Sequence, residues 1–569
     1  MKTLKLSLVS LLMVFTSLAA FADSGTDALK RLPVQDAGRI KPLDTLARET
    51  LQLIYGSQTY KTKKGEKRSA VEVVMTWMLV PQYWDEEKLI EITHRGLKES
   101  LSLPNEEKFY SPKELFANQR LSLVMQQLAG RRETKEKLDP YYQAVQRLES
   151  QLGSYQGIKE GTLIRVAPPA PGEATQVAGM FGDTEKWQAV SELRGDLQEK
   201  FALVTRSFIH ALPSENSAPA ENPPPPLDEV VEQFIVAARA QNPALYPDGK
   251  DIAVEIHYKA LHPFLISWIL YLLSAIVVGI AWQSGRQGFY KAGWILAILA
   301  FLMHTYGFGL RVYLTGRPPV SNMYESVIWV SWGAILFALI FEWLGKRRFV
   351  LISGAVVAVL CLIVADLAPA ILDPSLQPLE PVLRSNMWLM VHVLTITLSY
   401  SAFFLAWSLG NVGLAFVLRG EKPTSDRPRA LTDAVYRSMQ VGIVLLAAGT
   451  ILGGVWADYS WGRFWGWDPK ETWAFIALLG YLAVLHGRLV GWVRNFGLMV
   501  CAVVAFNLVI MAWYGVNFVL GAGLHAYGFG AGGAEYMAAF VILNLIYVAY
   551  VAYVNRSREA LELREKKQS

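Results

Sequence analysis

Tryptophan is concentrated in one short segment of this 569-residue chain, which holds 18 tryptophans in all. Five of them fall within residues 456–473, namely Trp456, Trp461, Trp465, Trp467 and Trp473. An aromatic belt at a membrane surface accounts for a tryptophan or two at a helix end, but not for so many in one loop. Indole rings held together in this way favour a platform for a large, flat, apolar ligand.

The same segment carries a helix-start signal. Asp468 precedes Pro469, and Glu471 stands three positions after the aspartate. This is the spacing of a capping box with proline at the first helical position, so we interpret Asp468 and Glu471 mainly as a helix cap. The cap also matters for function, because it fastens the aromatic loop to a rigid helix end.

Two histidines flank the tryptophan segment. His525 stands in the glycine-rich stretch 521–533, where glycine lets the backbone approach a planar ligand, and His392 lies near the beginning of the apolar run 387–418. A lone histidine is usually no more than a hydrogen-bonded polar group. Two neutral imidazoles beside an aromatic platform suit the two axial positions of a haem iron, so we consider this pair candidate ligands.

His486 is a different kind of candidate, because it lies inside an apolar stretch near the end of the run 472–491. An ionisable side chain within a membrane span is costly unless it has a partner, which makes it a functional candidate by default. The sequence offers no evident partner for His486.

Four cations belong to the same predicted face as the tryptophan segment: Arg311, Arg317, Arg463 and Lys470. Haem carries two propionates, and arginine can hold a carboxylate through two parallel hydrogen bonds. Contact with lipid head groups is the alternative for any one of these cations. Asn322 with Glu325 has the pattern of another helix cap.

The elements that must position these groups are membrane spans. Each of nine apolar runs is close to the roughly 20 residues that cross a bilayer, and they cover 263–282, 290–310, 326–344, 349–368, 387–418, 438–456, 472–491, 495–515 and 536–554. With alternating spans, 17 Lys and Arg residues flank one side and 5 the other. The positive-inside rule then places the C-terminus in the cytoplasm and the tryptophan segment outside.

The N-terminal part differs in composition. Residues 1–22 begin with Lys2 and Lys5, continue with an apolar stretch and end in small residues, the pattern of a secretory signal or an uncleaved anchor. The following residues are polar and broken by proline-rich linkers. Runs such as 67–80 and 188–211 predict amphipathic helices. We find no catalytic constellation there and favour a role in interaction or positioning.

The predicted fold is therefore an all-α polytopic membrane protein with about nine transmembrane helices, preceded by a mostly helical extracytoplasmic domain. Its parts are a signal peptide or anchor at 1–22, the extracytoplasmic domain at 23–230, a connector at 231–262, the transmembrane domain at 263–554 and a cytoplasmic tail at 555–569.

Composition excludes several other classes. The hydrophobic fraction of 52% and the mean hydropathy of +0.25 are high for a soluble protein. The basic residues form no single patch, which argues against nucleic-acid binding. Cys361 and Cys501 both lie in apolar runs, so the N-terminal part has no cysteine and a disulfide framework is excluded for it. The chain also has no CxxCH motif and is therefore not itself a c-type cytochrome.

Four stretches together resemble one protein family. WGRFWGWDPKETW, residues 461–473, resembles the tryptophan-rich WWD signature of haem-handling proteins. With SNMYESVIWVSW, SNMWLMVHVLTITLSY and GAGLHAYGFG, it stands in the order seen in the CcsA (ResC) type of system II cytochrome c synthase. The resemblance covers about residues 263–554, and residues 33–49 resemble the segment that precedes the CcsA part in long versions.

The resemblance implies a haem-lyase subunit of the cytoplasmic (inner) membrane. It would move haem b, iron protoporphyrin IX, to the outer face and attach it to the CxxCH of an apocytochrome c. His392 and His525 would ligate the iron there, and His486 would be one of an intramembrane histidine pair for haem in transit. The other residues implied at the haem site are Trp461, Trp465, Trp467, Asp468 and Arg463.

The second intramembrane ligand lies in the CcsB (ResB) portion of fused versions. No CcsB-like region precedes Pro263 here, so we expect a separate CcsB partner, with His304 as a further candidate ligand. Thiol-reducing proteins and membrane lipids are the other expected partners, and nucleic acid is not.

The chemistry expected of this family is thioether formation, for which a protein supplies ring orientation and iron ligation rather than a nucleophile. Two other functions stay open at this point. One is a haem exporter or chaperone without attachment activity, and the other is a membrane b-type cytochrome in electron transfer.

Overall fold

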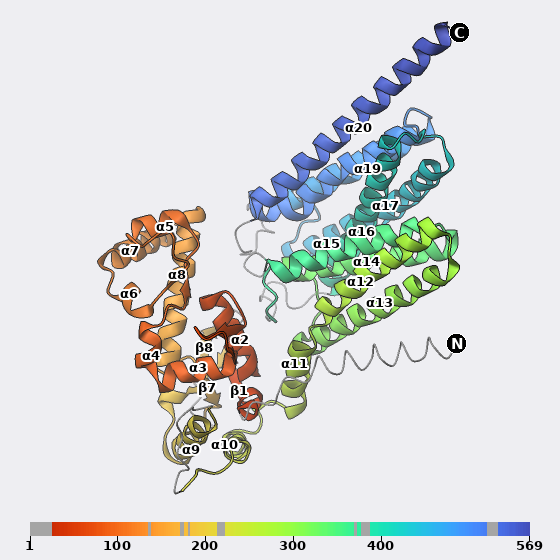
Figure 1. The fold of residues 1–569 in the computed structure, drawn as a ribbon. Coiled ribbons are helices and arrows are strands. Elements are labelled where there is room, and N and C mark those ends of the chain that lie inside the picture. The colour runs from red at the N-terminus through yellow and green to blue at the C-terminus, as the bar shows by residue number, and fades with distance from the viewer. Residues whose placement is uncertain are drawn as a thin grey trace. The chain divides into compact units, whose positions relative to one another are not determined.

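The computed structural model describes residues 26–134, 138–170, 176–179, 182–212, 222–368, 372–376, 387–520 and 533–568. The chain divides into two compact units, Met1–Leu261 and His262–Ser569 (Figure 1). The predicted signal or anchor at 1–22 lies outside the described residues.

The first unit combines helices with short strands. Its helices are α2 (Leu43–Tyr55), α3 (Ala70–Leu79), α4 (Pro81–Glu86), α5 (Arg95–Ser100), α6 (Pro112–Phe116), α7 (Gln119–Glu133), α8 (Pro140–Lys159), α9 (Gly195–Ala211), α10 (Leu227–Gln241) and α11 (Gly249–Leu261), with 3-10 turns η1 (Asp27–Arg31) and η2 (Val190–Glu192). An antiparallel sheet in the order β10 (Gln188–Ala189), β7 (Arg165–Ala167), β1 (Pro33–Asp36), β2 (Arg39–Pro42) joins the beginning of the unit to its middle.

Three further strand pairs correct the expectation of a mostly helical domain. They are β3 (Thr59–Lys61) with β4 (Lys67–Ser69), β5 (Ile90–Glu91) with β6 (Phe109–Tyr110), and β8 (Gln176–Gly179) with β9 (Gly182–Glu185). The helices predicted at 67–80 and 188–211 consequently begin later than expected, because residues 67–69 and 188–189 pair as strands. The helix after β4 begins at Ala70, where the Ser69 hydroxyl accepts a hydrogen bond from the Glu72 amide at 3.2 Å.

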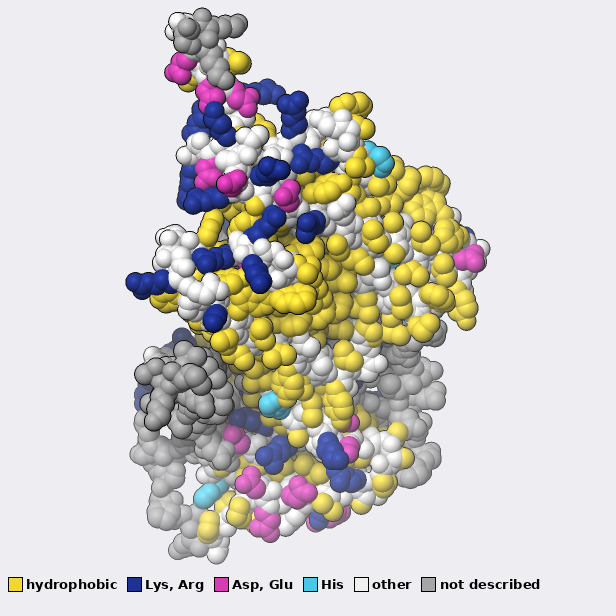
Figure 2. All heavy atoms as spheres, turned by 90° about the vertical axis from the view of Figure 1, so that its right-hand side faces the viewer, with side chains coloured by type: hydrophobic (Ala, Val, Ile, Leu, Met, Phe, Trp, Pro, Cys, Tyr) yellow, Lys and Arg dark blue, Asp and Glu magenta, His cyan; other side chains and the backbone are white. Residues whose placement is uncertain are grey.

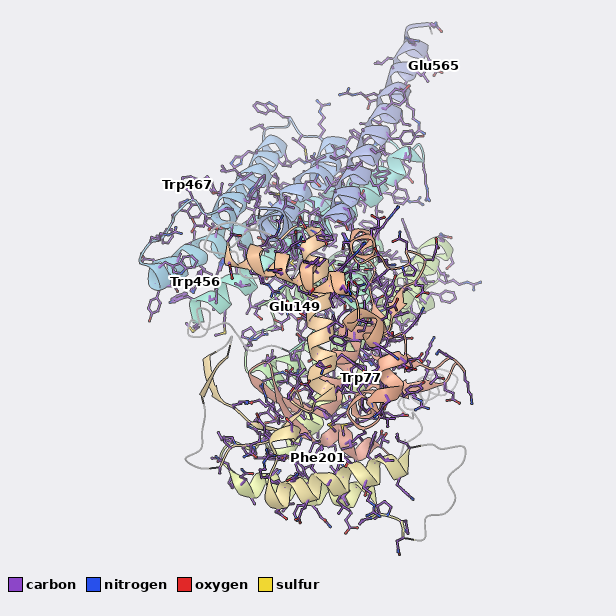
Figure 3. All side chains as sticks on the ribbon, turned by 90° about the vertical axis from the view of Figure 1, so that its left-hand side faces the viewer. Trp77, Glu149, Phe201, Trp456, Trp467 and Glu565 are labelled. Carbon is purple, nitrogen blue, oxygen red and sulfur yellow. The ribbon has the colours of Figure 1, made fainter. Side chains whose placement is uncertain are left out.

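The core of the first unit explains why α3 is not amphipathic. Every residue from Ala70 to Trp77 is buried, so the helix runs through the interior rather than over it. Trp77 meets Tyr155 of α8 edge to face at 5.5 Å, and Figure 3 places Trp77 inside the unit. A helix that is apolar on all sides is typical of a buried element.

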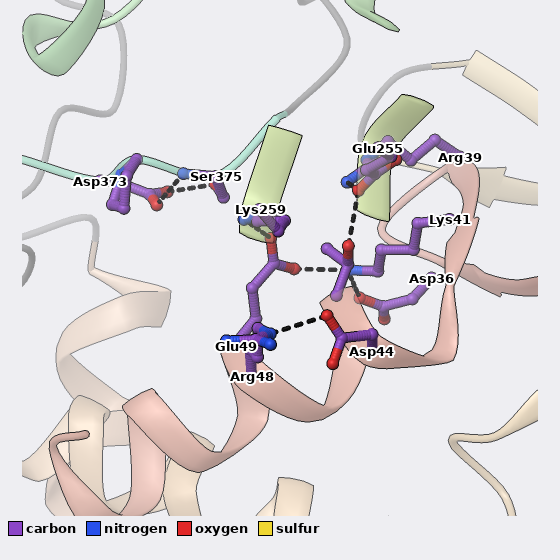
Figure 4. Close-up of polar contacts among 12 residues, drawn as sticks. Asp36, Arg39, Lys41, Asp44, Arg48, Glu49, Glu255, Lys259, Asp373 and Ser375 are labelled. Carbon is purple, nitrogen blue, oxygen red and sulfur yellow. Dashed lines mark hydrogen bonds and ion pairs between the residues drawn. The ribbon is translucent and has the colours of Figure 1, made fainter. Parts of the chain in front are cut away.

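Buried charges fasten α11 to the sheet and to α2 (Figure 4). Arg39 of β2 donates from both guanidinium nitrogens to the Glu255 carboxylate, at 2.8 and 2.9 Å, and the Thr45 hydroxyl donates to Glu255 at 2.8 Å. Such two-pronged pairs fix orientation as well as distance. Because α11 is the last helix of this unit, the cluster holds the end of the unit to its beginning.

Glu49 makes this attachment sensitive to acid. Burial opposes its ionisation, yet Lys41 at 2.7 Å and Lys259 at 3.7 Å lower the pKa of Glu49 to about 2. A carboxyl group with a lowered folded-state pKa contributes stability above its unfolded pKa, and this contribution is lost as the pH falls through the folded value. The sensitive window therefore runs from about pH 4.5 down to about pH 2.

We expect amides of α2 and α11 to keep their protection from hydrogen exchange above that window and to lose it within the window. Glu49→Gln should lower the protection at neutral pH by on the order of 3 kcal/mol and flatten its pH dependence. Exchange of the full chain in nanodiscs, corrected for intrinsic rates, measures both effects. Glu99→Gln, in the exposed Arg95–Glu99 pair, is the control and should change little. Equal protection of α11 at pH 7 and pH 3 would contradict the expectation.

The second unit is a bundle of long helices. They are α12 (Pro263–Ser284), α13 (Gln287–Thr315), α14 (Met323–Gly345), α15 (Phe349–Leu367), α16 (Met387–Leu418), α17 (Asp426–Trp461), α18 (Pro469–Leu489), α19 (Asn495–Ile510), which continues as the π-helix η4 (Met511–Leu520), and α20 (Ala534–Gln568). Within the described ranges, nine helices are long and apolar enough to cross a membrane, which confirms the nine predicted spans.

The surface of this unit fits a multi-pass membrane protein. Figure 2 shows a broad hydrophobic face, with Lys and Arg side chains gathered at the end from which the C-terminal part of α20 projects. Inside the bundle, α16 packs most extensively against α17. Gly449 of α17 permits this approach, because a Cβ atom there would lie 2.8 Å from the Cβ of Ile396.

Candidate functional site

A cavity opens at one end of the second unit. Its walls come from residues 318–326 around the beginning of α14, the first turns of α16, the last turns of α17, the start of α18 and η4. The space between these walls, together with its open mouth, measures about 1360 Å³.

His392 projects into this cavity from α16 in a defined tautomer. Its Nδ1 lies 2.6 Å from the carbonyl oxygen of Gly449, and a carbonyl can only accept, so Nδ1 carries the hydrogen. The lone pair of the neutral imidazole is then on Nε2. Metal-ligating histidines usually donate their other ring N–H to a carbonyl or carboxylate in this way, so His392 has the chemistry of an iron ligand.

Gly453 provides the space for the His392 ring. A Cβ atom at Gly453 would lie 2.6 Å from Cε1 and 2.8 Å from Nδ1 of His392, closer than real atoms approach. Gly449 and Gly453 are four residues apart and so face the same side of α17. One glycine therefore accepts the ring's hydrogen bond and the other admits the ring.

The tryptophans of residues 456–473 differ in whether they line the cavity. Trp456 and Trp465 line the cavity, and Trp456 is only 1% exposed. Trp461 meets Trp456 edge to face at 4.6 Å, and Trp467 meets Trp465 in the same manner at 5.8 Å. Trp467 is 67% exposed and lies at the edge of the bundle in Figure 3. Four of the five indoles thus pack as two edge-to-face pairs, and of the five only Trp456 and Trp465 line the cavity.

A further aromatic residue of the wall was not anticipated. Trp513 of η4 lines the cavity, donates from Nε1 to the Ser326 hydroxyl at 2.9 Å, and lies 6.0 Å from the ring of Tyr400. Asn517, one turn further on, lines it as well and donates to the Trp513 carbonyl at 2.8 Å. Trp513 and Asn517 are four residues apart, which would place them on one face of a helix. This spacing is hard to recognise in the sequence because both residues lie in an apolar run. π-Helical segments of this kind often mark functional sites.

The predicted capping box of α18 is confirmed. The Asp468 carboxylate accepts from the Lys470 amide at 3.0 Å, and Glu471 accepts from the Asp468 amide at 3.2 Å and the Gly466 amide at 2.7 Å. Asp468 is buried. The cap fastens the tryptophan loop to α18, beside the cavity.

The four predicted outer cations have different surroundings. Arg311 and Arg317 each approach the Glu325 carboxylate to 2.7 Å, and all three side chains are buried. Arg463 pairs with Glu471 at 3.5 Å and lies 5.7 Å from the Trp461 ring.

The fourth cation, Lys470, lines the cavity. Asn322 caps α14 as predicted, since its side-chain oxygen accepts from the Glu325 amide at 2.8 Å.

His486 and His304 lie apart from the cavity wall. His486 is exposed on the surface of α18, and its Nδ1 donates to the Leu482 carbonyl at 2.8 Å. His304 is fully buried, stacked on Phe308 at 5.2 Å and 3.4 Å from the Tyr271 hydroxyl. His525 and its glycine-rich loop lie outside the described residues, so only His392 of the predicted axial pair is placed.

Comparison with known proteins covers the same region. The family model for cytochrome C assembly proteins matches residues 320–525, which include most of the cavity wall. The CcsA cytochrome c biogenesis protein of Guillardia theta is 34% identical over 290 residues, covering 46% of this chain and 92% of its own length. The CcsA protein of Prochlorococcus marinus is also 34% identical, over 296 residues, with 46% and 91% covered.

A longer match extends into the first unit. Protein NrfI of Wolinella succinogenes is 30% identical over 520 residues, which is 87% of this chain but 53% of NrfI, so the chain spans about half of that relative. Among solved structures, the cytochrome c haem lyase CcmF aligns with a TM-score of 0.37 at 18% identity, over 52% of this chain and 50% of that one. The CcsA matches cover almost the whole length of those relatives, and the chain therefore belongs to the CcsA-type cytochrome c biogenesis proteins.

Proposed function

We propose that the chain binds haem b in the cavity beside His392 and presents it for covalent attachment to the CxxCH of an apocytochrome c. The observation that carries the proposal is the His392 imidazole, whose Nδ1 donates to Gly449 while the ring lines a cavity walled by Trp456, Trp465 and Trp513. A nitrogen lone pair among indole rings fits a flat iron porphyrin. His525 is the proposed second axial ligand.

The attachment step needs orientation more than acid–base chemistry. Each cysteine S–H adds across one haem vinyl group, so that a C–S bond forms, the hydrogen goes to the other vinyl carbon, and nothing is oxidised. His392 holds the iron, and the tryptophan wall keeps the ring in one plane. Because the substrate thiols must be reduced, thiol-reducing proteins are proposed partners.

The proposed orientation puts the cavity outside the cytoplasm, in the cytoplasmic (inner) membrane. Seventeen Lys and Arg residues flank one side of the spans and five the other, which favours the C-terminal end as cytoplasmic. The first unit is then extracytoplasmic, with 231–262 as its connector and 555–569 as the cytoplasmic tail.

A membrane partner of the CcsB/ResB type is proposed from His486. This imidazole is exposed on α18 with its Nδ1 bonded to Leu482, so its lone pair belongs to Nε2, and one such side chain offers only one axial ligand. A partner helix would supply the other for haem in transit. His486→Ala should then lower the haem content of the complex purified with the partner. The binding of added haem by the chain without the partner should not change.

The test of the proposal is co-expression of a CxxCH reporter with this chain, with and without a CcsB-type partner, followed by a denaturing haem stain. Covalent haem on the reporter that needs both proteins supports attachment. Haem found only on this chain supports a chaperone or exporter. Redox-active haem that stays in the chain, with no reporter labelled, supports a b-type cytochrome.

Gly453→Ala tests the steric setting of His392. The added methyl group would lie 2.6 Å from the imidazole and must displace it, so we expect haem affinity to fall at least about tenfold. The readout is haem titration in nanodiscs, with helix content by circular dichroism as a folding check. Gly309→Ala is the matched control, since a Cβ atom there meets nothing within 4 Å. Equal affinity in the two variants would show that the ring position does not matter.

A further inference from the structure

A buried tyrosine hydroxyl belongs to the wall of the cavity. Tyr400 of α16 lines the cavity and is only 5% exposed, and the centre of its ring lies 6.0 Å from that of Trp513 in η4. Among the residues that the structure describes, none forms a hydrogen bond with the Tyr400 hydroxyl. A buried hydroxyl left unpaired costs free energy, so one that borders a cavity indicates a ligand group that pairs with it.

A buried amide oxygen on another wall of the cavity is also unpaired. Asn517 of η4 lines the cavity, and its Nδ2 donates to the Trp513 carbonyl at 2.8 Å, which identifies Oδ1 as the other end of the amide. Oδ1 is buried and has no hydrogen-bonding partner within the described part of the chain. The Tyr400 hydroxyl can donate and the Asn517 oxygen can accept. The two therefore suit a ligand group that offers both an acceptor and a donor.

Tyr400 lies on the same face of α16 as the proposed iron ligand. His392, Ile396 and Tyr400 follow one another at intervals of four residues, and all three line the cavity. The rise of an α-helix places Tyr400 about 12 Å further along α16 than His392. Because an imidazole projects sideways from its helix, a flat ring ligated through Nε2 extends alongside α16. The rim of such a ring reaches toward Tyr400.

We propose that Tyr400, together with Asn517, is a positioning residue that binds a propionic acid group of haem. The inference rests on the proposed function and extends it to the recognition of the substrate. The rim of haem b carries methyl, vinyl and propionate groups, and of these only the propionates form hydrogen bonds. The Tyr400 hydroxyl donates to the carboxyl group, and the acid in its protonated form donates to Oδ1 of Asn517. The vinyl groups occupy the opposite part of the rim, so they point toward the beginning of α16, where the cavity opens and the thiols can approach.

The test compares haem with iron etioporphyrin, which has the same ring and iron but only alkyl groups on its rim. The full chain in nanodiscs is titrated with each ligand, as wild type and as Tyr400→Phe. The variant should bind haem about tenfold more weakly than wild type, because the carboxyl group loses its donor, and should bind iron etioporphyrin unchanged. Without a ligand, the variant should unfold at the same temperature as wild type or slightly higher, since the hydroxyl that it lacks has no partner there.

Tyr481→Phe is the matched control. Tyr481 of α18 also has a buried hydroxyl with no partner among the described residues, but it does not line the cavity. The same substitution at this position should leave the affinities for both ligands unchanged.

The outcomes separate the two claims. An unchanged haem affinity in Tyr400→Phe, or an equal loss for both ligands, overturns the role of Tyr400 while leaving haem binding intact. A ligand-free Tyr400→Phe chain that is less stable than wild type, or does not fold, shows that the hydroxyl has a structural role and overturns the inference as well. Wild type that binds neither ligand, or binds both independently of His392, overturns the proposed function and this inference with it.

Discussion

His392→Ala is expected to lose about 99% of the haem affinity of the wild-type chain while inserting into the membrane normally. The reason is that the imidazole lines the wall with its lone pair on Nε2, the tautomer being set by the bond from Nδ1 to Gly449 at 2.6 Å. Changes that only misorient a metal ligand already cost about 10- to 100-fold, so removal should cost at least the upper value. Absorption spectra of the purified chain measure haem content and the low-spin signature of two axial nitrogen ligands.

Added imidazole provides the internal check on this prediction. It should enter the space left by the side chain and restore part of the low-spin spectrum in His392→Ala. His210→Ala, an exposed histidine of the first unit, is the matched control and should bind haem as wild type does. If His392→Ala kept its haem content and its spectrum, His392 would not be an iron ligand, and the cavity would need another explanation.

Glu325→Ala is expected to destabilise the second unit by about 3–5 kcal/mol. The Glu325 carboxylate is fully buried between Arg311 and Arg317, each 2.7 Å away. Without it two guanidinium groups are left in the interior with no neutralising charge. Arg311 also donates to the carbonyls of Pro374 and Ser375, at 2.9 and 3.3 Å, so the segment 372–376 should loosen as well.

Thermal unfolding in detergent, followed by tryptophan fluorescence, measures the loss of stability, and hydrogen exchange reports on residues 372–376. The combined variant Arg311→Met, Glu325→Leu, Arg317→Met should recover much of the stability, because it removes the charges together rather than stranding two of them. A Glu325→Ala chain as stable as wild type would show that the arginines find other partners.

Much of the second unit could be predicted because its signals are local. A membrane span depends on the composition of about 20 consecutive residues, and all nine predicted runs correspond to helices in the described chain. The cap of α18 was predictable for the same reason, since Asp468, Pro469 and Glu471 are adjacent in sequence. The strands of the first unit were missed because runs of two to four residues carry little signal of their own and depend on the segment that pairs with them, which for β1 includes the distant β7.

The site was predicted in part. Its tryptophan segment and His392 carried readable signals, but Trp513 and Asn517 lie in an apolar run in which every side looks alike. A helix of that kind has no amphipathic stripe to show which residue faces a cavity and which faces lipid. His525 and its glycine-rich loop, outside the described residues, stay a prediction.

By itself the sequence determined the number of spans, the charge difference between their two sides and the loop in which aromatic rings collect. Only the tertiary structure decided that Nδ1 of His392 donates to a carbonyl 57 positions away and that two of the five indoles in residues 456–473 line the cavity. It also decided that Lys470 lines the cavity while Arg311 and Arg317 pair with Glu325. The physical reason is that insertion into a membrane depends on the average composition of a segment. The tautomer of an imidazole and the partner of a charge depend on individual atoms that helices distant in sequence bring within 3 Å of each other.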